Sequence, residues 1–421
     1  MVTDAPPLHA GRTRARPSDG YRYARALLVI FLVTAVDVFN LLDRASRGGP
    51  TRYAILLVPA VAALAIRTRG STLVRRPRTH ERLLLILFAF GLLGTTYGIV
   101  FLHITSTARA IFLPMSIAIL ALLVIEPIRE EEARRLVRLI AWIGTIYIVL
   151  GAVTYSGLAE SLAAYRQFKN ASFPYTMLGI SAALLLGHRA WAFVLAGLTA
   201  VIFFGYPSAT SVLIILVTAL TFFATSTRAS RTRPYLIAAT ILAIGVAGLV
   251  NFNSSVEIAD RYFDAVGKRN TTAGRLEFWT NGLAQWRASP LIGSGFASET
   301  VIEASRNRRS PYHNDFVLFL AEGGIVGCAL FVSWLVLLLR DLLHRYFAFA
   351  DSGAVSQALL ARLLLVGLGS YVVSMLFNPV IQGLSRSATI FALAAISTAL
   401  GRPESVPAET ALERRSALVP A

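Results

Sequence analysis

The sequence predicts an all-α, polytopic membrane protein with about 12 transmembrane helices and a large external loop between the ninth and the tenth. Hydrophobic residues make up 55% of the 421 residues and charged residues only 15%, whereas soluble domains average about 45–50% and 25%. Apolar runs long enough to cross the roughly 30 Å hydrocarbon core of a bilayer recur along nearly the whole chain. One long segment, 252–312, interrupts them with charged and aromatic residues. This composition excludes a water-soluble globular protein.

The length criterion of about 20 mostly apolar residues for each helix divides the chain into five parts. They are a disordered basic tail (1–23), the first nine helices (24–251), the loop (252–312), the last three helices (313–400) and a second tail (401–421). The candidate helices lie near 24–42, 52–66, 83–102, 108–125, 136–155, 173–187, 189–204, 209–224, 235–251, 313–339, 359–377 and 385–400.

The distribution of Lys and Arg residues predicts the orientation. If the N-terminus is cytoplasmic, the cytoplasmic side holds 24 of the 40 Lys and Arg residues, and the short loops of the other side hold seven. Loop 252–312 is set aside because long loops follow the positive-inside rule poorly. We therefore expect both termini in the cytoplasm and the loop outside the cytoplasmic membrane. The net charge of +17 follows from the same rule, so no nucleic-acid partner is expected.

Loop 252–312 contains six acidic and eight basic residues together with several large aromatic residues, so we expect it to fold as a small cap of short helices. Its first motif, 271–279 (TTAGRLEFW), predicts a helix in which Arg275 and Trp279 lie one turn apart. Arg275 either binds an anionic group or pairs with Glu277 or Asp264.

Two further glycine-containing motifs follow. In 290–296 (PLIGSGF), Gly293 and Gly295 permit a tight turn, which either approaches an anionic group or only reverses the chain. Gly324 and Gly327 lie in the next apolar segment, where glycines by themselves indicate close helix packing.

The third motif, Tyr312-His313-Asn314-Asp315, opens a long apolar helix at the external membrane boundary. The dipole of this helix favours an anionic substrate near His313. By itself, such a histidine is more often an interfacial or capping residue than a base. The nearby basic residues Arg306, Arg308 and Arg309 either bind an anionic substrate or form a solvated patch that contacts lipid headgroups.

The order and spacing of these motifs are more specific than any one of them. His313-Asn314 is followed by nine residues and then by Gly-x-x-Gly, and Gly-Arg-x-x-x-Trp and Pro-x-x-Gly-x-Gly precede it. Together they resemble the O-antigen ligase and polymerase superfamily, bacterial enzymes that handle polyprenyl-diphosphate-linked glycans. The residues that carry the resemblance are Gly274, Arg275, Trp279, Gly293, Gly295, His313, Asn314, Gly324 and Gly327.

The resemblance implies a GT-C-like membrane glycosyltransferase of the bacterial cytoplasmic (inner) membrane that acts in cell-envelope polysaccharide biosynthesis. Its expected donor is a glycan on a polyprenyl (undecaprenyl) diphosphate carrier, and its acceptor is a glycan or a lipid-linked glycan. Membrane lipids surround it, and no cofactor or metal ion is implied. His313 matches the family's essential histidine, and Arg275 matches its loop arginine.

A weaker match concerns the second arginine that binds the diphosphate. Segment 165–170 (YRQFKN), ahead of Pro174, is similar to an external arginine segment of the family, so Arg166 is a candidate for this role beside the 306–309 cluster. Many relatives carry Ser-Arg at the start of a middle helix, where this chain has 207–211 (PSATS). That departure leaves the second arginine open.

These residue types suit the reaction that the resemblance implies. Arginine stays charged and offers a bidentate fork to phosphate oxygens, and histidine can take the proton of an acceptor hydroxyl near neutral pH. A base opposite the leaving group predicts inversion at the sugar carbon. No Asp-x-Asp pair lies on an external loop, and the single Cys328 cannot form a cysteine-based metal site, so a metal-dependent transferase is not expected.

Two alternatives to a ligase remain open. A polymerase of the same superfamily uses the same donor and differs only in its acceptor. A lipid-linked glycan transporter or flippase would share the polytopic architecture, but transporters usually contain structural repeats and charged residues near the middle of the membrane. Here the ionisable residues lie mainly at helix ends and in one loop, which favours the enzyme.

Overall fold

The computed structural model describes residues 78–101, 128–155, 173–205, 209–225, 272–295, 302–303, 308–309, 312–378, 380–381 and 384–401. The expected segments that lie outside these residues are the tail 1–23, the candidate helices 24–42, 52–66, 108–125 and 235–251, the first part of the loop (252–271), and nearly all of the tail 401–421.

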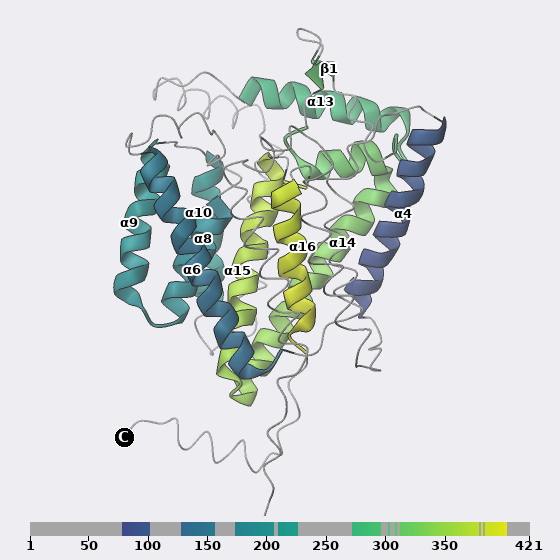
Figure 1. Ribbon diagram of the computed structural model, residues 1–421. Coiled ribbons are helices and arrows are strands. Elements are labelled where there is room, and N and C mark those ends of the chain that lie inside the picture. The colour runs from purple at the N-terminus through teal and green to yellow at the C-terminus, as the bar shows by residue number, and fades with distance from the viewer. Residues whose placement is uncertain are drawn as a thin grey trace, which may run out of the picture.

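The described part is helical apart from one very small sheet (Figure 1). Its helices are α4 (Thr79–Phe101), α6 (Glu130–Tyr155), α8 (Phe173–Leu185), α9 (Arg189–Gly205), α10 (Ala209–Ala224), α13 (Thr272–Ala288), α14 (Asp315–Ser352), α15 (Val355–Phe377) and α16 (Leu384–Ala399). Strands β1 (Ile302–Glu303) and β2 (Arg308–Arg309) pair antiparallel within the loop. The sequence did not predict these strands.

Most helices stand side by side as a bundle, and α13 lies across one end of it (Figure 1). Within the described ranges, three helical segments are long and apolar enough to cross a membrane: Glu130–Val153, Asp315–Ser352 and Val355–Phe377. Four shorter apolar helices of 10–17 residues accompany them. Together with α4, these segments make eight expected membrane helices that are helical within the described residues. The total of about 12 stays a prediction by the length criterion.

Helix α15 occupies the centre of the bundle. It contacts α6, α8, α10, α14 and α16, and 72% of its most apolar stretch is buried. Its sequence is apolar on all sides, which is typical of a helix that has no face toward water. Leu364, Val366 and Tyr371 of this helix have no exposed surface.

Two other helices, α6 and α8, approach each other through glycines. A Cβ atom added to Gly144 would lie 2.2 Å from the Cα atom of Gly179. Small residues at such crossings allow helix backbones to touch, which gains van der Waals contact where lipid offers no hydrophobic driving force.

Two arginine side chains cap the C-terminal ends of helices on the side of the bundle away from α13. Arg362, which lies inside an expected membrane helix, donates to the hydroxyl of Thr225 at 2.8 Å and to the carbonyl of Phe222 at 2.7 Å. Arg345 donates to the carbonyl of Ser397 at 2.7 Å. Both arginines therefore place positive charge at the C-terminal ends of α10 and α16, where the helix dipole is negative.

The helix opened by the 312–315 motif differs from the sequence expectation in two ways. It continues to Ser352, well beyond the expected end at 339, and it is broken at Gly324, where φ is 62° and ψ is −167°. A glycine adopts this conformation without the clash that a Cβ atom would cause. The break separates a short first half, 315–323, from the long second half of α14.

The contact between α6 and α8 predicts the effect of a small substitution. Gly144→Ala should lower the thermal unfolding temperature of the purified protein in detergent, because overpacking of a tight contact costs about 1–3 kcal/mol. Gly197→Ala, in α9, is the control, since a Cβ atom there meets nothing within 4 Å. A Gly144→Ala protein that unfolds at the wild-type temperature would contradict this view of the α6–α8 contact.

Candidate functional site

His313 lies where the chain enters α14, and its backbone is left-handed, with φ at 55°. Within the described part of the chain it is the one non-glycine residue with a positive φ. This conformation costs an L-residue about 1–2 kcal/mol, and it persists only where neighbouring structure holds it. The His313 side chain is half-buried.

The residues that follow His313 fix the start of α14. The side-chain oxygen of Asn314 caps the helix by accepting hydrogen bonds from the backbone N–H groups two and three residues further on, at 2.9 and 3.1 Å. The buried carboxylate of Asp315 accepts hydrogen bonds from the N–H groups of Val380 and Ile381, both at 2.9 Å. The N-terminal end of α14, which favours anions, is thereby tied to the connection between α15 and α16.

One face of α13 packs against Tyr312 and His313, just before the start of α14. The ring of Phe278 stacks on the imidazole of His313, with 5.5 Å between ring centroids and 26° between planes. A Cβ atom on Gly282 would lie 2.9 Å from the Tyr312 ring, and the Tyr312 hydroxyl donates to Oε1 of Gln285 at 2.5 Å. Residues 278, 282 and 285 recur at helical spacing, so a single face of α13 supports His313.

The loop after α13 supplies hydrogen bonds to the break in α14. In a continuous helix, the N–H groups of Ile325 and Val326 would donate to carbonyls four residues earlier. Because Gly324 turns the chain away, Ile325 donates instead to the carbonyl of Pro290 at 2.9 Å, and Val326 donates to that of Leu291 at 3.2 Å.

The carbonyls freed by the break are satisfied from the same loop. The Ala321 carbonyl accepts from the Ser294 N–H at 3.1 Å, and the Glu322 carbonyl accepts from the Gly295 N–H at 2.9 Å. Four backbone hydrogen bonds to the loop thus replace two within the helix. The backbone groups that form these four bonds therefore all have partners. In lipid, each such group without a partner would cost several kcal/mol.

Glycine is required on both sides of this contact. A Cβ atom on Gly293 would lie 2.3 Å from the Glu322 carbonyl, and one on Gly324 would lie 2.3 Å from the Leu291 carbonyl oxygen. The φ angle of Gly293 is 68°, again in the left-handed region. Because the N–H groups that follow Gly293 are bonded to α14, the geometry favours the turn interpretation of the Gly-x-Gly motif over anion binding.

The remaining residues of the sequence motifs lie around this centre. Gly274 and Arg275 are in the first turn of α13, and Trp279 follows Phe278 on that helix and is half-buried. Gly327 is buried in the second half of α14. The structure thus brings together the helix of Arg275, the Gly-x-Gly turn, His313 and the Gly324 segment.

The other expected arginines are not brought together with His313 by the described contacts. Arg308 and Arg309 form β2, where Arg308 pairs with Glu303 and Arg309 with Ile302 in the antiparallel ladder. Arg166 and Arg306 lie outside the described residues. Their role in diphosphate binding stays a prediction.

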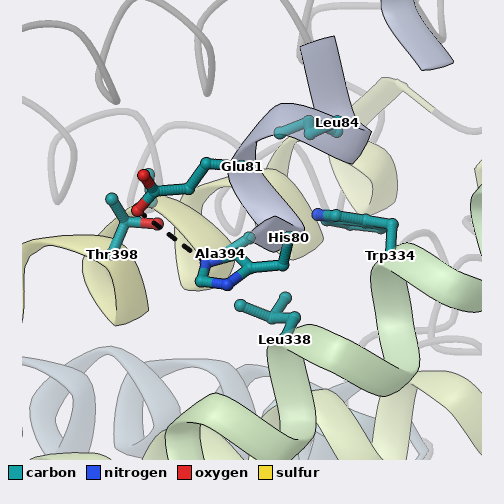
Figure 2. Close-up of a pocket in the computed structure, with 8 residues that line it drawn as sticks. His80, Glu81, Leu84, Trp334, Leu338, Ala394 and Thr398 are labelled. Atoms are coloured by element: carbon teal, nitrogen blue, oxygen red, sulfur yellow. Dashed lines mark ion pairs between the residues drawn. The ribbon is translucent and has the colours of Figure 1, made fainter. Parts of the chain in front are cut away.

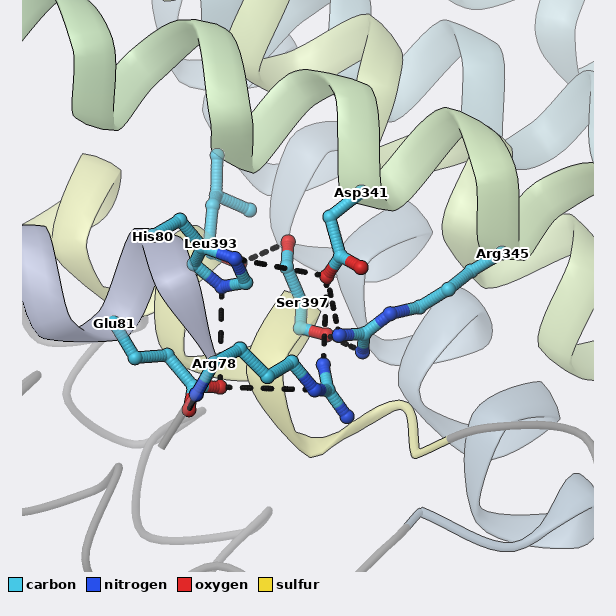
Figure 3. Close-up of polar contacts among 7 residues, drawn as sticks. All are labelled: Arg78, His80, Glu81, Asp341, Arg345, Leu393 and Ser397. Carbon is cyan, nitrogen blue, oxygen red and sulfur yellow. Dashed lines mark hydrogen bonds and ion pairs between the residues drawn. The ribbon is translucent and has the colours of Figure 1, made fainter. Parts of the chain in front are cut away.

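A separate polar cluster surrounds Asp341, which lies in α14, 28 residues after His313 in the sequence. Nε2 of His80 is 3.8 Å from a carboxylate oxygen of Glu81, and its Nδ1 is 3.7 Å from one of Asp341 (Figure 3). Arg78 is 3.5 Å from the Asp341 carboxylate, which Arg345 also contacts. These ion pairs connect the start of α4 with the second half of α14.

A cavity of about 10 Å³ adjoins this cluster (Figure 2). It is lined by His80, Glu81, Leu84, Trp334, Leu338, Ala394, Ala395 and Thr398. This volume is close to the minimum for a single water molecule and is far too small for a sugar. We therefore assign the cluster and its cavity to the anchoring of helices and not to the candidate site.

The arrangement around His313 can support a specific kind of chemistry. An imidazole at the positive end of a helix can accept a proton from a hydroxyl while an anionic group is stabilised close by. Among the described residues, no group of three or more His, Cys, Asp and Glu side chains is arranged to hold a metal ion. The described groups at this point are the imidazole of His313 and the N-terminal end of α14.

Four supporting residues were given no supporting role by the motif analysis, although Phe278 and Asp315 lie within its motifs. The spacing of Phe278, Gly282 and Gln285 marks one helical face, but their sequence does not reveal which partner that face contacts. Asp315 carried no signal, because the N–H groups that donate to its carboxylate lie 65 and 66 residues away along the chain.

The contact between the loop and the break predicts a difference between matched glycines. Gly293→Ala and Gly324→Ala should each lower the unfolding temperature more than Gly353→Ala does. Gly353 also has a positive φ, of 76°, but a Cβ atom there meets nothing within 4 Å. Gly353→Ala should therefore cost only about 1–2 kcal/mol for the left-handed backbone. Equal losses in all three variants, measured by thermal unfolding in detergent, would mean that the contact contributes nothing.

Comparison with known families agrees with the motif resemblance. Residues 174–332 match a family model described as O-Antigen ligase, and this range includes α13, the loop to α14, His313 and the break at Gly324. No curated protein matches the chain. The family match over residues 174–332 confirms the resemblance seen in the motifs.

Proposed function

We propose that the chain is a membrane glycosyltransferase that moves a glycan from a polyprenyl diphosphate carrier to an acceptor hydroxyl at the external face of the cytoplasmic membrane. The observation that carries the proposal is the position of His313. Its imidazole is held at the N-terminal end of α14 against α13, inside the segment that matches the O-antigen ligase family. The first turn of α13 contains Arg275.

In the proposed reaction, His313 acts as the general base. The acceptor hydroxyl gives its proton to the imidazole as its oxygen forms a bond to the anomeric carbon of the donor. The bond from that carbon to the phosphate oxygen breaks, and the carrier diphosphate leaves with the electron pair. Arg275 stabilises the charge that grows on the diphosphate, together with a second arginine from the set Arg166, Arg306, Arg308 and Arg309. Attack from the face opposite the leaving group inverts the sugar carbon.

The surface beside the site supports a lipid-linked donor. Leu291 and Ile292 at the tip of the loop are 67% and 61% exposed, and Ile325 and Val326 next to the break are 52% and 40% exposed. On α14, Val332 and Val336 are further exposed apolar residues. A polyprenyl chain that lies in the bilayer would meet a surface of this kind close to the reacting diphosphate.

Basic residues support the proposed orientation. In the described part of the chain they gather near the ends of helices away from α13, and this group includes Arg78, Arg82, Arg129, Arg134, Arg135, Arg138, Arg189, Arg340 and Arg345. By the positive-inside rule, this distribution supports a cytoplasmic location for those ends and an external location for α13 and His313.

The proposal predicts a loss of glycan transfer when the base is removed. His313→Ala and His313→Gln, in a deletion strain complemented with this gene, should reduce transfer by about 10²–10⁴-fold. The carrier-linked glycan should accumulate while the surface polymer disappears. Stranded full-length chains would identify a ligase, and stranded single repeat units would identify a polymerase.

The matched control is His188→Ala. His188 is exposed in the turn between α8 and α9, so its removal should leave polymer output unchanged. Normal polymer output from His313→Ala, at wild-type protein levels in the membrane, would contradict the assignment of the base. Flux of labelled lipid-linked glycan across liposomes without any new glycosidic bond would favour a transporter instead.

A further inference from the structure

The proposed reaction requires that the imidazole of His313 point consistently toward the acceptor. The backbone of His313 is left-handed, so its orientation depends on what packs around it. Within the described residues, the aromatic ring that stacks on it comes from α13 and not from α14. The position of the imidazole therefore depends on how α13 is held in register with the start of α14.

A directional chain of side-chain hydrogen bonds provides that register. The Tyr312 hydroxyl donates to Oε1 of Gln285 at 2.5 Å, and Nε2 of Gln285 donates to the Ser294 hydroxyl. The Ser294 hydroxyl in turn donates to the Ala321 carbonyl at 3.3 Å, one of the two carbonyls freed by the break in α14. The donors and acceptors along this chain therefore run in one consistent direction.

Gln285 is the central member of this chain. It is the only one of the four on α13, and it connects the residue before His313 with the residue that seals the break. Its side chain is half-buried, so an apolar replacement would leave a tyrosine hydroxyl and a serine hydroxyl without their present partner. The replacement would remove the hydrogen bonds that tie α13 to the start of α14, and α13 could then shift.

We propose that Phe278 and Gln285 are positioning residues that together fix the imidazole of His313. Phe278 restricts the rotation of the ring by stacking on it, and Gln285 fixes the Tyr312-His313 peptide relative to α13. Gly282, between them, allows the helix to lie directly on Tyr312.

This inference rests on the proposed function, and its test separates the two. Purified protein in liposomes would be assayed with radiolabelled carrier-linked glycan extracted from the deletion strain, and with membranes of that strain as acceptor. The variants are Phe278→Leu, Phe278→Tyr, Gln285→Leu, Tyr312→Phe and the double variant Gln285→Leu/Tyr312→Phe. His313→Ala is assayed beside them, and each variant is checked for its elution volume and unfolding temperature.

Phe278→Leu and Gln285→Leu should each lower kcat by about 10- to 100-fold, the range for a base displaced by about 1 Å. The KM for the donor should stay within about twofold, since the proposed diphosphate ligands are unchanged. Phe278→Tyr keeps the ring and should restore most of the kcat. The double variant should lose little more than Gln285→Leu alone, because both substitutions break the same chain.

Two control variants match these changes elsewhere. Phe316→Leu removes a half-buried ring that lies 5.8 Å from Phe331, and Gln357→Leu removes an amide that donates to the Ile128 carbonyl at 2.8 Å. Both should retain kcat within about twofold of the wild type.

An inactive His313→Ala beside fully active Phe278→Leu and Gln285→Leu would overturn the inference and leave the proposed function intact. Phe278→Tyr as impaired as Phe278→Leu would also overturn it. Full activity of His313→Ala would instead overturn the proposed function.

Discussion

The hydrogen bonds exchanged between the loop after α13 and the break in α14 determine the geometry of everything near His313. In this exchange the N–H groups of Ile325 and Val326 and the carbonyls of Ala321 and Glu322 all find partners in the loop. Each of these groups, if buried without a partner, would cost about 1–3 kcal/mol, so the break and the loop are stable only together. The direction of the short first half of α14, and with it the position of His313, follows from that exchange.

The helices could be predicted from the sequence, whereas the break could not. Long apolar runs give α6 and α15 directly because a membrane requires every backbone group to be bonded within its own helix. The same reasoning treated Gly324 as a packing residue, since a glycine in an apolar run does not reveal a left-handed φ. Only the close contact between Gly293 and the break explains why positions 293 and 324 are both glycine. A Cβ atom on Gly293 would lie 2.3 Å from the Glu322 carbonyl.

Only part of the site could be predicted from the sequence, for a related reason. The order of the motifs that contain His313, Arg275 and the glycines was enough to predict a resemblance to one family. The family match confirms that resemblance. The residues that hold His313 are on an element far away in sequence, so spacing along the chain could not reveal them. Phe278 and Gln285 were recognised only from the ring contact and the hydrogen bonds that they form.

Hydrogen exchange of the purified protein, read by mass spectrometry on peptides that cover 289–295 and 321–327, tests most directly whether the loop seals the break. If it does, the amides of Ser294, Gly295, Ile325 and Val326 should exchange as slowly as those in the interior of α14, and they should open together, as one cooperative unit. Fast exchange of the loop amides beside a protected α14 would show that the loop is not bonded to the helix. The account of how His313 is held would then be wrong.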